Sequence, residues 1–108
     1  MKIIETEKAP KAIGTYSQAT KVDGFLFISG QIPLDPKTME LVEGIENQIN
    51  QVFENIRQIL KADGMDFSNV VKLSVLLDDL NHFEKVNEIM VSIFSKPYPA
   101  RAAYEVSK

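Results

Sequence analysis

The chain of 108 residues is long enough for one domain, and its 44% hydrophobic content is enough for a single core. It contains no cysteine, which excludes disulfides, thiolate zinc sites and cysteine nucleophiles, and one histidine, His82, which excludes a multi-histidine metal site. The formal net charge of −3, with scattered lysines, argues against a nucleic-acid or anionic-membrane surface. A polar start and the lack of a long apolar run predict a cytoplasmic protein without a signal peptide or membrane span.

The first thirty residues predict three short strands. Residues 1–4 form the first, an irregular loop covers 7–16, and residues 17–22 form the second. Asp23-Gly24 is a strong two-residue hairpin signal, and 25–29 is the returning strand. That strand is apolar on both faces, so we expect it to be buried on both faces.

Ser29 and Gly30 stand where this strand ends. A hydroxyl and a bare backbone at such a place can approach a ligand closely. The alternative interpretation is a simple strand exit with a bulge. Ser29 and Gly30 are therefore candidate ligand contacts.

A helix is predicted in the middle of the chain. A turn leads to a short extended piece at 39–43, and apolar residues then recur at helical spacing over 45–60. Gly64 follows, where a left-handed residue commonly ends a helix. The apolar stripe of this helix is expected to face the core.

A strand and a second helix follow. Residues 70–77 alternate as a strand with one dry face, and a helix is expected from Asn81 to about residue 94. Asn81 and Glu84 have the spacing of a capping pair. Asn87 lies at the edge of the apolar seam of this helix, where solvation is the simplest interpretation.

The segment 96–101 is the most constrained stretch of the chain. Its two prolines fix φ and keep the preceding residues out of the helical region, so the segment must be rigid and extended. It ends at Arg101, one of two arginines against ten lysines, and a short strand is expected at 102–106. A guanidinium held still is suited to binding a carboxylate through two hydrogen bonds, whereas a solvated surface charge is the alternative.

This order of elements predicts an α+β fold. We expect a single domain, residues 1–108, with two layers: one sheet, and two helices on one face of that sheet. The opposite sheet face carries apolar side chains. Burial against sister subunits is the simplest way to cover it, so a homo-oligomer is expected.

Three segments in order and spacing resemble the RidA/YjgF family of reactive-intermediate (enamine/imine) deaminases. They are 12–19 (AIGTYSQA), 28–33 (ISGQIP) and 98–101 (YPAR). The resemblance implies a chorismate-mutase-like fold that forms a trimeric barrel with ligand clefts between subunits. It also implies hydrolysis of 2-aminoacrylate and related 2-imino acids to 2-keto acids and ammonia, without a cofactor or metal.

The resemblance also implies the site residues. Arg101 would bind the substrate carboxylate and Tyr16 would act with it in catalysis. Ser29, Gly30 and Asn87 would line the cleft, and the backbone at Ala103 would contact the ligand.

The chain departs from the family pattern at its end. Relatives continue beyond the position of Lys108 into a strand with a glutamate thought to handle water or the proton, and Glu105 is not its counterpart. The sequence is expected to be a truncated piece. Two alternative functions remain open: a module that binds small carboxylates such as 2-keto acids without turnover, and an RNA-directed translation inhibitor.

Overall fold

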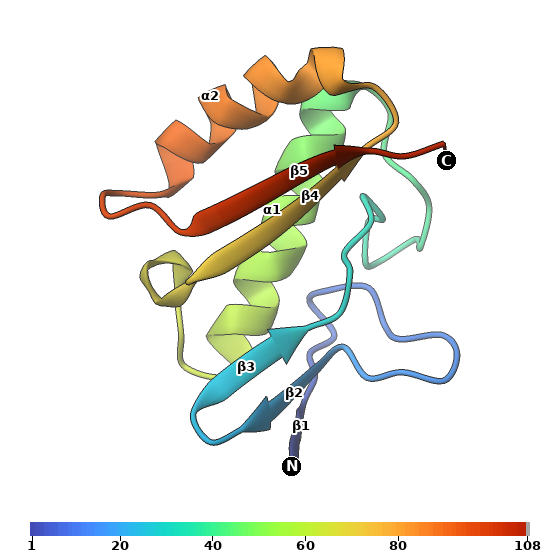
Figure 1. Ribbon diagram of the computed structural model, residues 1–108. Helices are drawn as coiled ribbons and strands as arrows, with labels where there is room; N and C mark the ends of the chain where they lie inside the picture. The colour runs from blue at the N-terminus through green and yellow to red at the C-terminus, as the bar shows by residue number, and fades with distance from the viewer. Residues whose placement is uncertain (108) are drawn as a thin grey trace. The chain divides into compact units, whose positions relative to one another are not determined.

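The computed structural model describes residues 1–107 (Figure 1). The chain consists of two compact units. The first unit is Met1–Met65, and the second begins at Asp66. Each unit contains one α-helix and one sheet. The fold is therefore α+β with two helices and mixed sheets, as the sequence predicted.

The first unit begins with a three-stranded antiparallel sheet. Its strands are β1 (Lys2–Ile4), β2 (Ala19–Val22) and β3 (Phe25–Ile28), in that spatial order. The predicted hairpin between β2 and β3 is confirmed, because both loop residues have positive φ, 51° at Asp23 and 81° at Gly24. Two such residues give the loop the twist that a tight hairpin needs.

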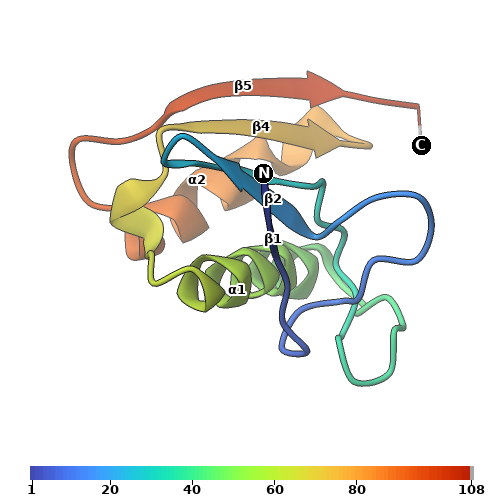
Figure 2. The ribbon, with the colours of Figure 1, turned by 90° about the horizontal axis from the view of Figure 1, so that it is seen from below.

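Helix α1 (Ile45–Ala62) packs on one face of this sheet (Figure 2). Ile59 is fully buried and belongs to a core cluster with strand residues Ile4 and Ala19. The helix runs close to its predicted bounds, and Gly64 follows it with φ of 70°, as expected for a residue that ends a helix.

The two faces of β3 differ in burial. Leu26 and Ile28 pack against the core cluster. Phe25 and Phe27 point to the other face and are 62% and 59% exposed on this chain. The expected burial on both faces therefore holds for one face, and the other face is an exposed apolar surface.

A buried polar side chain ties α1 to the loop after β3. Asn55 is completely buried. Its amide donates to the carbonyl oxygens of Ile32 at 3.4 Å and Leu34 at 3.0 Å, while its Oδ1 accepts from Gln51. A buried amide with these partners fixes the segment that leaves Gly30, because any shift would leave polar atoms without hydrogen bonds.

The second unit is a parallel strand pair joined by a helix. Its elements are η1 (Phe67–Asn69), β4 (Lys72–Leu77), η2 (Leu80–His82), α2 (Phe83–Ile93) and β5 (Ala100–Glu105). A parallel pair requires a crossover connection, and α2 supplies it on one face of the pair (Figures 1 and 2). The predicted alternation holds along β4 itself, because Leu73, Val75 and Leu77 are partly or fully buried whereas Lys72, Ser74 and Leu76 are exposed. Val71, which the alternation placed on the dry face, precedes the strand and is 73% exposed.

The short 3-10 helix η1 has a side-chain cap. Asp66 accepts hydrogen bonds from the backbone and hydroxyl of Ser68, and Asn69 accepts from the Asp66 backbone. The Ser68 hydroxyl and the Ser68 N–H both stabilise the carboxylate, so they lower the pKa of Asp66 below its ordinary value. This cap fixes the chain just before β4.

Three expectations about the elements were wrong. The strands form two sheets, of three and two strands, where the sequence predicted one sheet. The predicted Asn81–Glu84 capping pair does not form, because Asp79 accepts from the Asn81 backbone and begins η2 ahead of α2. The extended piece at 39–43 reduces to an isolated bridge between Leu34 and Leu41, since Met39 has φ of 60° and breaks any strand.

No helix within residues 1–107 is long and apolar enough to cross a membrane.

The hydrogen bonds of Asn55 should have a measurable effect on stability. Asn55→Leu removes the side-chain donor to the Leu34 carbonyl and the acceptor of the Gln51 amide, while the Ile32 carbonyl keeps only the Leu34 N–H. We therefore expect the free energy of unfolding to fall by about 1–3 kcal/mol. Urea unfolding followed by circular dichroism measures this loss. Asn47→Ala on the same helix is the control, because Asn47 is exposed and its substitution should change stability by less than about 0.5 kcal/mol. Equal stability of the two variants would contradict the role of Asn55.

Candidate functional site

The guanidinium of Arg101 lies against one face of helix α2. Its Nη1 donates to Asn87 Oδ1 at 2.6 Å and to Met90 Sδ at 3.4 Å. Its Cζ lies 4.5 Å from the centroid of the Phe83 ring, within the range of a cation–π interaction. The three helix residues follow at intervals of four and three, which places them on one face of α2.

The backbone of β5 fixes the other end of the Arg101 side chain. Arg101 stands opposite Leu73 in the parallel ladder, and Ala100 donates to the carbonyl of Val71 at 3.0 Å. The proline-rich segment 96–99 leads directly into this strand. Arg101 is therefore held at its backbone by a strand and at its guanidinium by a helix.

This arrangement leaves one edge of the guanidinium open. The two contacts of Nη1 use both of its N–H groups, and Nε and Nη2 still carry donors along one side of the planar group. Within residues 1–107, no carboxylate forms an ion pair with Arg101. A planar carboxylate fits such an edge through two parallel hydrogen bonds.

Asn87 contacts the guanidinium of Arg101 directly. The sequence resemblance suggested that it contacts the ligand, and the structure shows its Oδ1 accepting from Arg101. A neutral acceptor orients the arginine without cancelling its charge, which an aspartate at this position would do.

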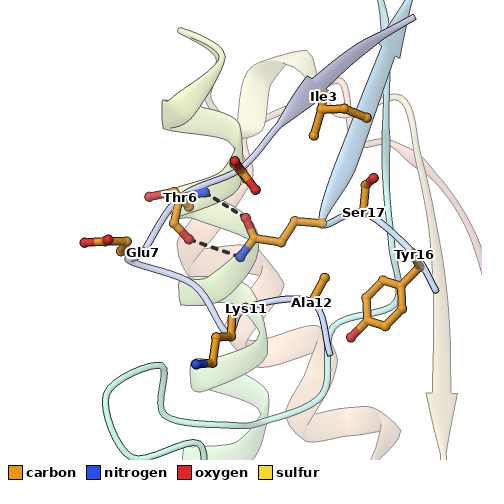
Figure 3. Close-up of a pocket in the computed structure, with 9 residues that line it drawn as sticks. Ile3, Thr6, Glu7, Lys11, Ala12, Tyr16 and Ser17 are labelled. Carbon is orange, nitrogen blue, oxygen red and sulfur yellow. Dashed lines mark hydrogen bonds between the residues drawn. The ribbon is translucent and has the colours of Figure 1, made fainter. Parts of the chain in front are cut away.

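Tyr16 lines a cavity in the first unit (Figure 3). The cavity has a volume of about 500 Å³, and the 5–12 loop and residues 16–18 contribute most of its walls. Tyr16 is 52% exposed, so its ring and hydroxyl are accessible. A phenol hydroxyl both donates and accepts hydrogen bonds, which suits contact with a polar ligand or a water molecule.

Ser29 holds the segment that follows Tyr16. Its Oγ donates to the carbonyl of Ser17 at 2.6 Å, and its backbone N–H donates to the carbonyl of Gln18 at 2.9 Å. With its proton engaged, the hydroxyl can only accept from a ligand. Gly30 is exposed, and no atom lies within 4 Å of where a Cβ would stand, so space is open beside it.

The remaining predicted residue lies on β5. Ala103 stands opposite Val75 in the ladder and is partly buried. Glu105 lies further along the same strand, and its carboxylate accepts from the backbone of Leu80 at 3.0 Å. Glu105 thus stabilises the start of η2.

The structure brings some of the predicted site residues together. Arg101 and Asn87 are in contact in the second unit. Tyr16 and Ser29 are connected in the first unit through the Ser17 backbone. Phe83 and Met90 were not among the predicted site residues, and both contact the guanidinium. The spacing of Phe83 and Met90 relative to Asn87 indicates that the three residues share one face of the helix. It does not reveal that Arg101 lies against that face.

Metal-binding side chains do not gather in the described part of the chain. Among residues 1–107, no group of three or more His, Asp or Glu side chains is placed to hold a metal ion.

Comparisons with known proteins match almost the whole chain. The family model described as Endoribonuclease L-PSP matches residues 6–108. The human protein named 2-iminobutanoate/2-iminopropanoate deaminase is 51% identical over 107 residues, which are 98% of this chain and 78% of the human protein.

Solved structures agree with the sequence match. RidA from the Antarctic bacterium Psychrobacter sp. PAMC 21119 superposes with a TM-score of 0.96 at 52% identity, covering 99% of this chain and 87% of that one. TdcF from E. coli, solved with bound serine, gives a TM-score of 0.94 at 36% identity, covering 100% and 87%.

Both kinds of comparison reach the family that the three sequence segments indicated. The chain belongs to the RidA/YjgF family.

Proposed function

We propose that this protein is a hydrolytic deaminase that converts 2-imino acids to 2-keto acids and ammonia. The observation that carries the proposal is the fixed guanidinium of Arg101 with an open edge for a carboxylate. Relatives named 2-iminobutanoate/2-iminopropanoate deaminase at about 50% identity support the reaction type. The bound serine in TdcF supports an amino-acid-like ligand, because serine also carries a carboxylate next to a nitrogen-bearing carbon.

The proposed reaction needs no covalent intermediate with the protein. An enamine such as 2-aminoacrylate first tautomerises to the 2-imino acid. Water then adds to the C=N group, its oxygen bonding to carbon and one of its protons going to nitrogen. The proton of the new hydroxyl then also moves to nitrogen, and the C–N bond breaks to leave a C=O group and ammonia. The protein has to hold the carboxylate, orient the water and assist the two proton transfers to nitrogen.

The proposed roles follow from the groups available. Arg101 binds the carboxylate through Nε and Nη2, and Asn87 and Phe83 keep the guanidinium plane in place. Tyr16 contributes a hydroxyl that orients the water or transfers its proton. Ser29 accepts a hydrogen bond from the substrate nitrogen, since its own proton is engaged with Ser17. Gly30 leaves room for the substrate, and the backbone at Ala103 contacts it.

We further propose that the protein is a homotrimer with the ligand clefts between subunits. The support is the exposed apolar face of the first sheet, where Ile3, Val22, Phe25 and Phe27 are between 44% and 62% exposed. An apolar surface of this kind on a small protein marks an interface. The cytoplasmic location and the organisation of residues 1–108 as a single domain also remain proposals.

A binding module without turnover is the second candidate. The observation that favours it concerns Glu105, which lies on the same strand as Arg101. Its carboxylate already accepts a hydrogen bond from the Leu80 backbone and is therefore not placed to act on a substrate. The RNA-directed alternative has the family description in its favour. The net charge of −3 weighs against it, because nucleic-acid binding relies on basic surface.

Replacing Arg101 tests the deaminase proposal. Arg101→Lys keeps the charge but loses the two-donor edge, so we expect kcat/KM for 2-iminopropanoate to fall about 100-fold, or about 2.7 kcal/mol. The substrate is generated in situ from alanine by an amino-acid oxidase, and keto-acid release is compared with the rate without protein. Arg57→Lys is the matched control, because Arg57 is the other arginine and pairs with Glu54 on the exposed side of α1.

The outcomes separate the candidate functions. Keto-acid release no faster than the background, together with saturable binding of pyruvate, would replace the deaminase by the binding module. Release by Arg101→Lys equal to that by Arg57→Lys would remove the carboxylate-binding role of Arg101.

Asn87→Asp tests whether the arginine must remain unpaired. A carboxylate 2.6 Å from Nη1 forms an ion pair with Arg101 and competes with the substrate, so we expect KM to rise about tenfold while the fold is retained. Steady-state kinetics over a range of substrate concentrations measures this change. Asn81→Asp adds the same charge just before α2 and should leave KM within about twofold. An unchanged KM in Asn87→Asp would show that Arg101 does not bind the substrate.

Charge placed on the exposed face of the first sheet tests the assembly. Phe27→Glu puts a carboxylate at the centre of the proposed interface, where its burial is unfavourable, so we expect the trimer to dissociate to single chains. Analytical ultracentrifugation gives the mass. Val91→Glu is the control, since Val91 is an equally exposed apolar residue on α2 and should leave the trimer intact. A trimeric mass for Phe27→Glu would exclude this face as the interface.

A further inference from the structure

A buried glutamine joins the two sides of the loop that carries Tyr16. Gln18 is only 4% exposed, and its side chain forms four hydrogen bonds. Its Oε1 accepts from the backbone of Thr6 at 2.7 Å (Figure 3). Its Nε2 donates to the carbonyls of Thr6, Ala9 and Pro10, at 3.1, 3.3 and 2.7 Å.

The other end of the same loop is held by Ser29. The Ser17 carbonyl accepts from the Ser29 hydroxyl, and the Gln18 carbonyl accepts from the Ser29 backbone. The chain is thus tied down at Pro10 by a side chain and at Ser17 by the end of β3. Only residues 11–16 lie between these two points.

Residues 11–16 form one side of the cavity that Tyr16 lines. Ala12 and Tyr16, both labelled in Figure 3, line the cavity together with Gln18. Gly14 has φ of 126°, and a Cβ at this residue would stand 3.6 Å from the Tyr16 ring. The ring therefore rests close to the Gly14 backbone, and its position depends on the path of residues 11–16.

We infer that Gln18 is a positioning residue for Tyr16. A carboxamide is suited to this place because it offers two donors to the surrounding carbonyls and one acceptor to the Thr6 N–H while carrying no charge. Without these bonds the unattached part of the loop would extend from residue 16 back to about residue 5. A longer unattached loop samples more conformations. Tyr16 would then spend less time in the orientation that catalysis requires. This inference rests on the proposed function of Tyr16.

The test uses two substitutions of Gln18 in the full chain. Gln18→Leu removes all four hydrogen bonds. Gln18→Glu keeps the shape but turns an oxygen toward three carbonyl oxygens. We expect kcat to fall about tenfold in both variants at pH 8, with KM within about twofold, because the substrate carboxylate is bound by Arg101.

The pH dependence distinguishes positioning from a general loss of folded protein. Burial among carbonyl oxygens raises the pKa of the carboxyl introduced by Gln18→Glu above its ordinary value, so this carboxyl becomes neutral as the pH falls. Its O–H then donates to one of the carbonyls. Relative to the unsubstituted protein, Gln18→Glu should recover about threefold in kcat between pH 8 and pH 5.5, and Gln18→Leu should not recover.

Gln48→Leu is the matched control. Gln48 belongs to the same unit, and its side chain donates to one loop carbonyl, that of Val42, at 3.1 Å. It lies away from the Tyr16 loop in sequence, so kcat and KM should both stay within about twofold. All rates are corrected for the folded fraction measured by circular dichroism.

A second readout does not depend on activity. With 3-fluorotyrosine incorporated, Tyr16 gives a fluorine resonance that Tyr16→Phe assigns. In Gln18→Leu this resonance should shift or broaden, whereas those of Tyr98 and Tyr104 in the other unit should not change. A protein without deaminase activity would remove the proposed function, and this spectrum would still decide whether Gln18 positions Tyr16.

Two results would overturn the inference. One is an unchanged kcat in folded Gln18→Leu. The other is a Tyr16 resonance that is the same in Gln18→Leu as in the unsubstituted protein.

Discussion

The contact between the Arg101 guanidinium and helix α2 is the constraint on which the functional interpretation depends. Three different interactions meet there: a hydrogen bond to Asn87, a contact with the Met90 sulfur and the face of the Phe83 ring. Each is modest alone. Together they restrict a long side chain that would otherwise sample many rotamers, so less entropy is lost when a ligand binds.

The parallel pairing of β4 and β5 places helix α2 where it can contact Arg101. A parallel ladder needs a connection that crosses from one end of the pair to the other, and α2 makes this connection. The helix that closes the topology therefore also lies over the strand that carries Arg101. Topology and site are linked because one element serves both.

The first unit supplies a different kind of order. Gln18 and Asn55 are its two buried polar side chains among the described residues, and each bonds to backbone carbonyls of an irregular segment. In strands, the backbone N–H and C=O groups bond to neighbouring strands. A buried loop has no such partners, so side chains must supply hydrogen bonds to its backbone groups. Gln18 does this for the loop before Tyr16, and Asn55 does it for the segment after Gly30. The catalytic and binding residues proposed in this unit thus lie on or next to loops that the side-chain amides of Gln18 and Asn55 fix by hydrogen bonds.

Much of this protein follows from the sequence by itself. Helical periodicity located α1, the Asp23-Gly24 pair located the hairpin, and the alternation of β4 gave its buried face, because these depend on local geometry and on where apolar side chains must go. The three motif segments identified the family, and the prolines before Arg101 predicted a rigid approach to it. Only the tertiary structure decided that the strands form two sheets, that Asp79 caps the turn before α2, and that Phe83 and Met90 contact Arg101. These features depend on which segments meet in space, and spacing along the chain does not encode the partner that a side chain finds there.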